Sequence, residues 1–307
     1  MIPSFPQFKN LEVSDRSAIE SYTKSFPPYS DYSFASMWLW DHNSDTVISD
    51  LNGNLVVQLC DIRSGESFYS FIGTTDCDNV AEQLLEHLAS QSLTPELKLI
   101  PEVSAQKLDH TRFEVSEDRD MFDYIQCTKQ LALMLGSGFE GHRRNIRKFP
   151  KQDAEFRELD LSDATNQAKL RDCVACWTEL KNNHGRPRED WEIRCFEAEQ
   201  ISFQRMFQSQ DLLEAMTCSG LFVNGVLAGF SVGEIIHDHF LLHFHKSDYK
   251  HIGTIEFLFQ QLAILLLKRE IHFLNDEEDL GLPGLRLNKS RYRPVNFLKK
   301  YTVRRIQ

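Results

Sequence analysis

The chain has 307 residues, of which 41% are hydrophobic and 26% are charged, with a net charge of -11. This composition excludes extensive disorder, and no apolar run approaches the roughly 18 residues that cross a membrane. The N-terminus has no basic segment followed by an apolar one, and the seven cysteines are scattered, so we expect a cytoplasmic protein with reduced thiols.

The first half of the chain alternates between helical and strand-like patterns. We predict short helices at 15–25 and 33–40, and then a hairpin over 46–62 with Asn52 and Gly53 at its turn. After the hairpin come, in order, a strand at 68–72, an amphipathic helix at 78–89, a strand at 97–102, a short helix at 103–109 and further strand over 112–127.

The second half repeats this order. Helices are predicted at 166–182 and 195–208, followed by a hairpin over 219–236 with Asn224 and Gly225 at its turn. A third strand over 239–248, an apolar helix over 253–268, a strand over 271–275 and a terminal strand over 301–304 complete the pattern.

Helices, an antiparallel meander, a helix and a further strand form the order of a GNAT-type acyltransferase, which is an acyl-CoA N-acyltransferase fold. Because the order occurs twice, we predict an α/β (α+β) protein of two tandem GNAT-like domains with mixed, mostly antiparallel sheets. We place a structural N-terminal domain at 1–145 and a C-terminal domain with the active cleft at 146–307.

Basic residues gather in two islands on an otherwise acidic chain. Residues 286–307 hold eight Lys or Arg and no acidic residue, and residues 140–151 hold Arg143, Arg144, Arg147, Lys148 and Lys151 against Glu140. Such islands indicate local binding of anions, although a solvated helix and a basic tail would have the same composition.

The loop after the third strand of the second half, HKSDYKHIGT, occupies the position where GNAT folds bind the pyrophosphate of acyl-CoA. Lys250 and Gly253 fit that loop. Ile255 stands where a second small residue is expected, and a bulky side chain would obstruct a phosphate. The loop therefore predicts CoA binding only weakly.

Four histidines, at 237, 239, 243 and 245, alternate along one strand and would share one face of the sheet. Neighbouring positions on a strand rarely form a tetrahedral site, and no Cys or carboxylate pattern completes one, so we expect no metal. We expect His243 to line the cleft as a base or as a hydrogen-bond donor, whereas a partly buried polar strand face is the alternative.

The most unusual segment spans 274–294, where four acidic residues (Asp276, Glu277, Glu278, Asp279) directly follow a strand. Gly281, Pro283 and Gly284 are expected to turn the chain before four basic residues. Acidic groups can orient or deprotonate a nucleophile, and a Lys or Arg can stabilise an oxyanion or bind a phosphate. A surface network of salt bridges is the alternative interpretation.

This segment resembles the signature of proteins related to the C-terminal domain of phosphatidylglycerol lysyltransferase. The matching residues are Asn275, Glu277, Asp279, Leu280, Gly281, Gly284, Leu285, Arg286, Lys289, Tyr292 and Pro294. Residues 2–40, 123–125 and 142–149 also match, as do His243, Lys246 and Asp248. The resemblance implies a tandem GNAT fold and transfer of an amino acid from aminoacyl-tRNA to a lipid head group.

The leading hypothesis is an acyl or aminoacyl transferase of the GNAT superfamily that uses aminoacyl-tRNA and a lipid or peptide acceptor. His243, Glu277, Asp279 and Lys289 are its candidate catalytic residues. The candidate residues for binding the donor are Arg143, Arg144, Arg147, Lys148, Lys246, Lys250, Gly253 and Arg286. An acyl-CoA-dependent N-acetyltransferase and a non-catalytic ligand-binding protein remain as alternatives, and tRNA and an anionic lipid surface are the candidate partners.

Overall fold

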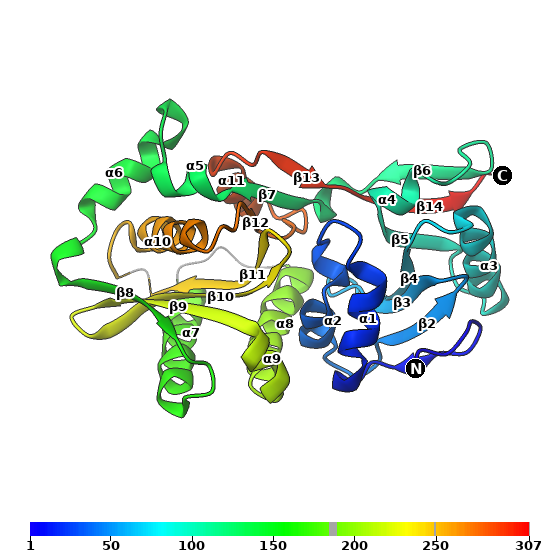
Figure 1. The fold of residues 1–307 in the computed structure, drawn as a ribbon, viewed down its shortest axis with the longest axis horizontal. Coiled ribbons are helices and arrows are strands. Elements are labelled where there is room, and N and C mark those ends of the chain that lie inside the picture. Colours follow the sequence, from blue (N-terminus) through cyan, green and yellow to red (C-terminus); the bar gives the residue numbers. More distant parts are fainter. Residues whose placement is uncertain (184–188, 249, 307) are drawn as a thin grey trace.

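Two seven-stranded mixed sheets form the framework of the protein and lie side by side (Figure 1). The computed structural model describes residues 1–183, 189–248 and 250–306. The strand order is β1-β2-β3-β4-β5-β14-β6 in the first sheet and β13-β7-β12-β11-β10-β9-β8 in the second. Neighbouring strands are antiparallel except for the β4–β5 and β11–β12 pairs, which are parallel.

The first sheet consists of β1 (Lys9–Asn10), β2 (Val47–Leu51), β3 (Asn54–Cys60), β4 (Ser67–Ile72), β5 (Glu96–Pro101), β6 (Phe113–Glu117) and β14 (Lys300–Arg305). Its helices are α1 (Arg16–Thr23), α2 (Phe34–Trp40), α3 (Cys77–Ser90) and α4 (Glu102–Ala105), with the short 3-10 helices η1 (Val13–Asp15), η2 (Ser30–Tyr32) and η3 (Arg119–Met121). Asn52 and Gly53 both have positive φ in the β2–β3 turn, as the predicted hairpin requires.

The second sheet consists of β7 (Asp123–Cys127), β8 (Ala154–Leu159), β9 (Met216–Val223), β10 (Val226–Ile236), β11 (His239–Ser247), β12 (Phe273–Asn275) and β13 (Asn296–Leu298). Around it are α5 (Thr128–Leu133), α6 (Glu140–Lys148), α7 (Ala164–Asn183), α8 (Asp190–Met206), α9 (Gln210–Ala215), α10 (Thr254–Lys268) and α11 (Pro283–Arg291), with η4 (Ser137–Phe139) and η5 (Lys151–Asp153). Helix α10 covers one face of the sheet and α7 lies on the other (Figure 1).

The predicted fold class is confirmed: the protein consists of two tandem GNAT-like units with mixed, mostly antiparallel sheets. In each unit an antiparallel meander leads into a helix and then a strand that pairs in parallel, β4–α3–β5 in the first and β11–α10–β12 in the second.

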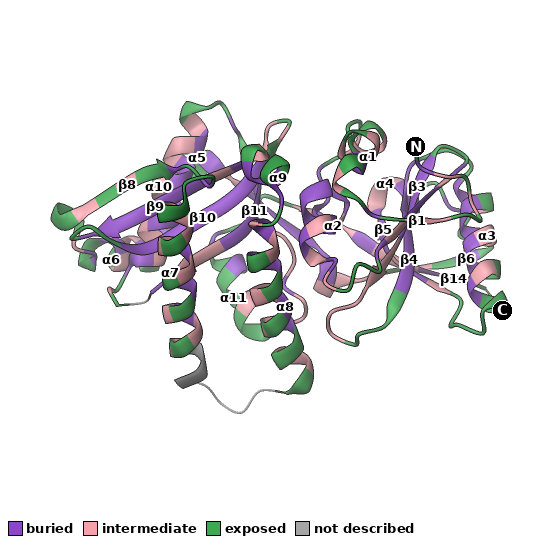
Figure 2. Ribbon diagram, turned by 90° about the horizontal axis from the view of Figure 1, so that it is seen from below, coloured by how far each residue is buried: buried purple, intermediate pink, exposed green. Residues whose placement is uncertain are grey.

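One hydrophobic core runs through both units. It joins Ile48 and Leu55 of the first sheet to Phe203 and Phe230 of the second unit, by way of the buried face of α2. The central strands are largely buried, whereas the distal turns of α8 are exposed (Figure 2). The two units are therefore packed against each other through a shared hydrophobic core.

Two strands lie in the sheet of the opposite half of the chain. Strand β7, at 123–127, lies between β12 and β13 of the second sheet, and the terminal strand β14 lies between β5 and β6 of the first. In Figure 1 the red C-terminal segment passes from one sheet to the other between β13 and β14. The predicted domain boundary at 145/146 remains a prediction. The two sheets do not divide the chain at that point, because β7 precedes it but lies in the second sheet, and β14 follows it but lies in the first.

The predicted turn at Gly281, Pro283 and Gly284 is only partly right. Gly281 lies in a turn with a φ of 74°, whereas Pro283 and Gly284 belong to α11, of which Pro283 is the first residue. Proline suits this position, since the first helical N–H has no intrahelical acceptor and the fixed φ of proline is already helical. Within residues 1–183, 189–248 and 250–306, no helix has both the length and the apolar composition needed to cross a bilayer.

Candidate functional site

A cavity of about 290 Å³ lies between the two units. Met37, Trp40, Leu59, Phe68 and Leu99 give it an apolar wall from the first half. The second half supplies a charged wall, which consists of Glu199, His243, His245, Lys246, Asp276, Glu277, Glu278 and Lys289. The cavity is therefore formed jointly by both units.

Strands β11 and β12 diverge where the charged wall begins. Their parallel pairing ends at Leu241 and Asn275. His243 and Glu277 each lie two residues further along, and His243 Nδ1 is 2.9 Å from Glu277 Oε1. The opening between the strands thus gives their side chains access to the cavity while the hydrogen bond joins the strand ends.

A β-bulge turns His243 toward the cavity. The β10–β11 register shifts between Val232 and Gly233, so that Phe244 and Leu242 have partners and His243 has none. A Cβ on Gly233 would lie 2.0 Å from the Leu241 carbonyl oxygen, so the close approach at the bulge requires glycine. The bulge also breaks the regular alternation on which the predicted row of four histidines depended, and His237 lies in the turn before β11.

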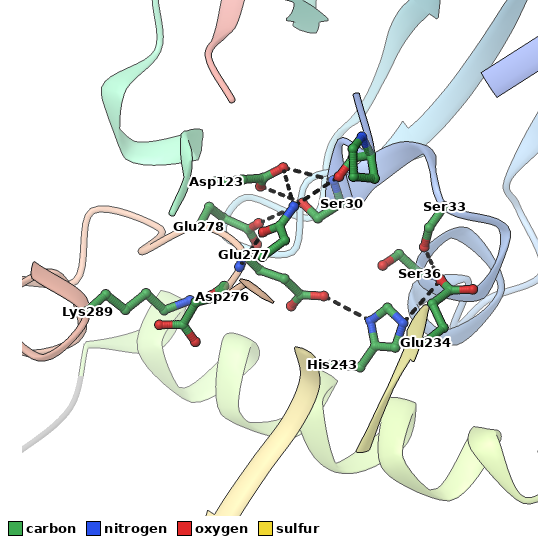
Figure 3. A network of polar contacts seen from close by, with 12 residues as sticks. Ser30, Ser33, Ser36, Asp123, Glu234, His243, Asp276, Glu277, Glu278 and Lys289 are labelled. Atoms are coloured by element: carbon green, nitrogen blue, oxygen red, sulfur yellow. Dashed lines mark hydrogen bonds and ion pairs between the residues drawn. The ribbon is translucent and has the colours of Figure 1, made fainter. Parts of the chain in front are cut away.

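The His243 ring is held between two carboxylates, with Glu277 on Nδ1 and Glu234 Oε1 3.3 Å from Nε2 (Figure 3). Burial lowers the pKa of His243, but the hydrogen bonds to Glu234 and Glu277 raise it to about 10. The imidazole is therefore protonated at neutral pH and donates from both nitrogens. This arrangement suits His243 to orienting Glu277 and not to accepting a proton.

His245 also lines the cavity and differs from His243 in its charge. Its Nδ1 lies 2.8 Å from Ser231 Oγ. Burial and the adjacent Lys246 lower the pKa of His245 to about 3, so the ring is neutral. Among the described residues, no group of three or more His, Cys, Asp and Glu side chains is arranged to hold a metal ion.

Three consecutive acidic residues, Asp276, Glu277 and Glu278, line the cavity, which a regular strand would not permit. The positive φ of Glu277, 55°, breaks the alternation after β12. Burial raises the pKa of Asp276 to about 6, although Lys289 lowers it, and burial raises the pKa of Glu278 to about 7. At neutral pH this wall is therefore only partly ionised.

The opposite unit uses a similar device. Between β5 and β14, Lys98 and Leu99 lie opposite the single residue Thr302, and Leu99 has a φ of 55°. This bulge lets both consecutive side chains line the cavity. Residues with left-handed backbone thus occur on both walls, as is common where a site must be shaped precisely.

Two predicted cations reach the cavity. Lys289 is 8% exposed, and its ammonium donates to the backbone carbonyl of Asp276. Lys246 forms an ion pair with Glu199 and lies 3.9 Å above the Trp177 ring. The structure therefore brings His243, Glu277, Lys289 and Lys246 together around one space.

Asp279 and Arg286 are bound to each other instead of to the cavity. Arg286 donates to Asp279 at 2.7 and 2.9 Å and to Asp120 at 2.6 Å. Tyr124 also donates to Asp279, at 2.5 Å. Neither Asp279 nor Arg286 is among the described residues that line the cavity. Burial raises the pKa of Asp279, but these hydrogen bonds lower it below its ordinary value.

Helix α6, which carries the first basic island, packs against the end of α11, which carries part of the second. His142 of α6 stacks on Tyr292 at 4.3 Å and contacts the Arg291 carbonyl oxygen, which fixes α6 beside α11. Arg144, Arg147 and Lys148 of α6 are exposed, and so are Arg291 and Arg293. We call these five cations the basic face. Arg143 instead donates to the carbonyls of Met134 and Gly136, which leaves it less available to a ligand.

The candidate CoA loop of the second unit is covered by the chain itself. Gly253 precedes α10 with a φ of 89°, and a Cβ there would lie 2.2 Å from the Asn145 carbonyl oxygen of α6. Asn145 also donates to Glu256 in the first turn of α10, at 2.7 Å. Lys250 is 60% exposed and pairs with Asp248 at 3.6 Å. Helix α6 therefore packs against the start of α10, where a GNAT fold is expected to bind a pyrophosphate.

The equivalent junction of the first unit is filled as well. Gly73 lies against Asn54, whose Oδ1 would be 2.0 Å from an added Cβ, and the Gly73 N–H donates to Ser104 Oγ at 3.1 Å. The Thr75 amide donates to Asn54 Oδ1. These contacts satisfy groups that would otherwise receive a phosphate.

A buried polar group that was not predicted from the sequence lies beside the cavity. Lys300 Nζ lies 2.7 Å from Asp123 Oδ1, and Ser30 donates to the same carboxylate through its backbone N–H and its hydroxyl. Asn275 joins the group through Asp123 Oδ2, at 3.3 Å. Lys300 was visible only as part of a basic tail, and no signal in the sequence placed it beside residues 30 and 123.

A family model described as "Phosphatidylglycerol lysyltransferase, C-terminal" matches residues 23–304. No curated protein matches the sequence.

Solved structures show the same architecture. A conserved protein of unknown function from Bacteroides thetaiotaomicron is 25% identical, with a TM-score of 0.81 over 100% of both chains. L-PGS from Bacillus licheniformis is 14% identical, with a TM-score of 0.64, and the match covers 97% of this chain and 93% of that one. A C-terminal DUF2156 domain from Agrobacterium fabrum is 11% identical, with a TM-score of 0.62, over 94% and 91%. The last two are evidence for the fold alone.

Proposed function

Since the chain belongs to the phosphatidylglycerol lysyltransferase C-terminal family, we propose that this GNAT-like transferase moves an aminoacyl group from aminoacyl-tRNA to a lipid head group or a peptide acceptor. The observation that carries the proposal is the cavity between the two units, where Glu277, supported by His243 and Glu234, and Lys289 line one wall of a space large enough for an aminoacyl group. The cavity is not filled by the chain's own side chains, which argues against a fold that has lost its site.

In the proposed reaction, a hydroxyl or amine of the acceptor attacks the ester carbonyl carbon of the aminoacyl-tRNA. Glu277 takes the proton of the nucleophile, and Lys289 stabilises the negative charge that develops on the carbonyl oxygen. The bond to the ribose oxygen then breaks, and that oxygen leaves with the proton that Glu277 took up. A new ester or amide forms on the acceptor, so no oxidant, metal or further reactant is needed.

The division of labour between His243 and Glu277 follows from their contacts. Both nitrogens of the protonated His243 ring are engaged by carboxylates, so we assign it to holding Glu277. Glu277 has its Oε1 on His243 and lines the cavity. A carboxylate held by an imidazolium is fixed in orientation, as a base must be.

The donor is favoured by two observations on the surface of the protein. Both loops that could bind a pyrophosphate in GNAT folds are packed against the chain, at Gly253 and at Gly73. The basic face, in contrast, carries five exposed cations, and such a surface attracts the phosphate backbone of a nucleic acid. We propose that Arg144, Arg147 and Lys148 contact the tRNA. In this proposal Arg143 fixes α6 through the Met134 and Gly136 carbonyls, and Lys250 lies near the end of α6.

The remaining predicted residues take supporting roles in this proposal. Lys246 borders the cavity, where it would contact the donor. Arg286 fixes Asp279, and through it the loop that precedes α11.

The test is a side-by-side titration with acetyl-CoA and with charged tRNA at low and physiological salt, followed by a transfer assay. Phosphatidylglycerol vesicles are the first acceptor to try, since the family description names that lipid. We expect salt-sensitive tRNA binding and transfer of labelled amino acid, with transfer reduced in Lys289→Ala. Lys268→Ala, in the last turn of α10, is the control. Binding of acetyl-CoA alone would indicate an N-acetyltransferase, and binding of neither would indicate a ligand-binding protein.

A further inference from the structure

Lys300 lies at the point where the chain passes from one sheet to the other. Leu298, the last residue of β13, pairs with Asp123 in the second sheet, and Lys300, the first residue of β14, pairs with Pro101 in the first. The Lys300 side chain is 1% exposed, which is rare for an ammonium group. A buried cation at this crossing needs carboxylate partners from several segments.

Three carboxylates surround this ammonium, and they come from three separate segments. Lys300 Nζ is 2.7 Å from Asp123, forms an ion pair with Asp31, and is 3.8 Å from Glu278. Asp31 lies on η2 of the first unit, Asp123 begins β7, and Glu278 follows β12. Asp31 and Glu278 line the cavity from opposite units, whereas Asp123 lies behind them.

The three acids do not depend on Lys300 equally. Asp123 also accepts the Ser30 N–H at 2.8 Å, the Ser30 hydroxyl at 2.6 Å and the Asn275 amide at 3.3 Å, so it has donors without the lysine. Glu278 has a longer contact with the same Ser30 hydroxyl, at 3.3 Å (Figure 3). Asp31 is held by its ion pair with Lys300. Loss of the Lys300 ammonium would therefore affect Asp31 and Glu278 more than Asp123.

We infer that Lys300 is a positioning residue that holds the carboxyl groups of Asp31 and Glu278 side by side on the cavity wall and sets how much negative charge that wall carries. The inference rests on the proposed function for its consequence, which is control of how a cationic aminoacyl group is received, but its physical content can be tested without a transfer assay.

Electrostatics gives the direction of the effect. Glu278 faces Lys300, Asp31, Glu277 and Asp123. Burial raises its pKa, Lys300 lowers it, and the three carboxylates raise it. Removing the ammonium removes the lowering influence, so Glu278 should become protonated at neutral pH. Removing Asp31 should have the opposite effect.

The experiment measures the pKa of Glu278 by NMR on protein labelled with 13C at the glutamate side-chain carboxyls, with the signal assigned by Glu278→Gln. In Lys300→Met we expect this pKa to rise by about 1–3, the size typical for loss of an opposite charge within a few ångströms. Lys300→Arg should restore most of the original value. Lys299→Met is the matched control, since the neighbouring lysine is exposed and pairs with Glu117.

An unchanged Glu278 pKa in folded Lys300→Met would overturn the inference. If that variant does not fold, Asp31→Asn decides the question: the pKa of Glu278 should fall, and an unchanged value would show that the two carboxyls are not coupled. Where transfer is detected, the pH profile of kcat/KM should move with the Glu278 pKa. Absence of transfer in the wild type would count against the proposed function while leaving the NMR result valid.

Discussion

His243 and Glu277 join two parallel strands just beyond the point where their backbone pairing ends. Leu241 and Asn275 form the last paired position of β11 and β12, and two residues further on the side chains meet at 2.9 Å. A side-chain hydrogen bond thus continues the ladder across the opening and places a carboxylate at the mouth of the cavity.

Glu277→Gln should remove the proposed base while keeping the shape of the side chain. We expect kcat/KM for aminoacyl transfer to fall by about 10²–10⁴-fold, the usual contribution of a general base. The pKa of His243 should fall too, because Glu277 raises it. Both are measurable, by single-turnover transfer and by NMR of the imidazole. Glu270→Gln, at an exposed position after α10, is the control. Full activity in Glu277→Gln would disprove the assignment.

His243 should give the protein a pH-dependent stability. Its pKa in the folded protein is about 10, above the ordinary value of 6.5, so its contribution is fully present below pH 6.5 and is lost as the pH rises through 10. At the acid end, burial raises the pKa of Glu234 but the His243 hydrogen bond lowers it below 4.5, so that contribution is lost as the pH falls.

The measurement for this prediction is urea unfolding of the wild type and His243→Gln between pH 5 and 10. The difference in free energy of unfolding should be largest near pH 5–6.5 and should shrink toward pH 10. A difference that stays constant over this range would mean that His243 is neutral in the folded protein.

An Asp279→Asn variant would show whether Asp279 takes part in the reaction or only stabilises the fold. Its carboxylate is fully buried and is held by Arg286, Tyr124 and Arg119. Asp279→Asn should lower the free energy of unfolding by about 1–3 kcal/mol, because Arg286 and Arg119 lose their charged acceptor. Transfer per folded molecule, measured well below the melting temperature, should change little. A large loss of kcat in a stable variant would instead return Asp279 to the catalytic group.

The sequence was sufficient to predict the fold class because the signals for it are local. These signals are the two hairpins with Asn-Gly turns and the apolar periodicity of α3, α7 and α10. Each of them lies within about 20 consecutive residues. The family resemblance is likewise confirmed by the match over 23–304. The placement of β7 and β14 in the opposite sheets was not predictable, because strand pairing between residues 101 and 300 leaves no local pattern.

The site was predicted in part for the same reason. Glu277, Lys289, His243 and Lys246 line the cavity, and they came from motifs close in sequence. Asp279 and Arg286 match the family signature equally well, but they form an ion pair with each other and do not line the cavity. A sequence signature does not distinguish a residue that stabilises the fold from one that takes part in the reaction. The bulges at His243 and at Lys98–Leu99 break the strand period, so a sequence argument based on alternation misplaces the side chains near them.

The basic face should contribute long-range attraction for tRNA. Arg144 and Arg147 are both exposed on α6. Reversing both to Glu should weaken binding of charged tRNA at least tenfold at low salt and reduce the slope of log Kd against log salt, because fewer counterions are released. Lys107→Glu, an exposed cation on the other unit, is the control. Equal tRNA binding by the wild type and all variants would show that the tRNA does not bind at the basic face.

Gly253 tests whether the α10 N-terminus is available to acyl-CoA. Its φ of 89° disfavours side chains, and a Cβ would meet the Asn145 carbonyl oxygen at 2.2 Å. Gly253→Ala should therefore destabilise the protein by about 1–2 kcal/mol through backbone strain alone, and more if α6 must move. Gly65→Ala, at a φ of 78° with open space around it, carries the strain without the contact and is the matched control.

The same contact predicts the outcome of a hydrogen-exchange experiment. Because α6 already covers the loop, adding acetyl-CoA should leave exchange at residues 250–256 unchanged in the wild type, while charged tRNA should slow exchange along α6. Protection of 250–256 by acetyl-CoA would require α6 to leave Gly253. It would show that the closed packing is one of two states, and the donor would then be a thioester of CoA.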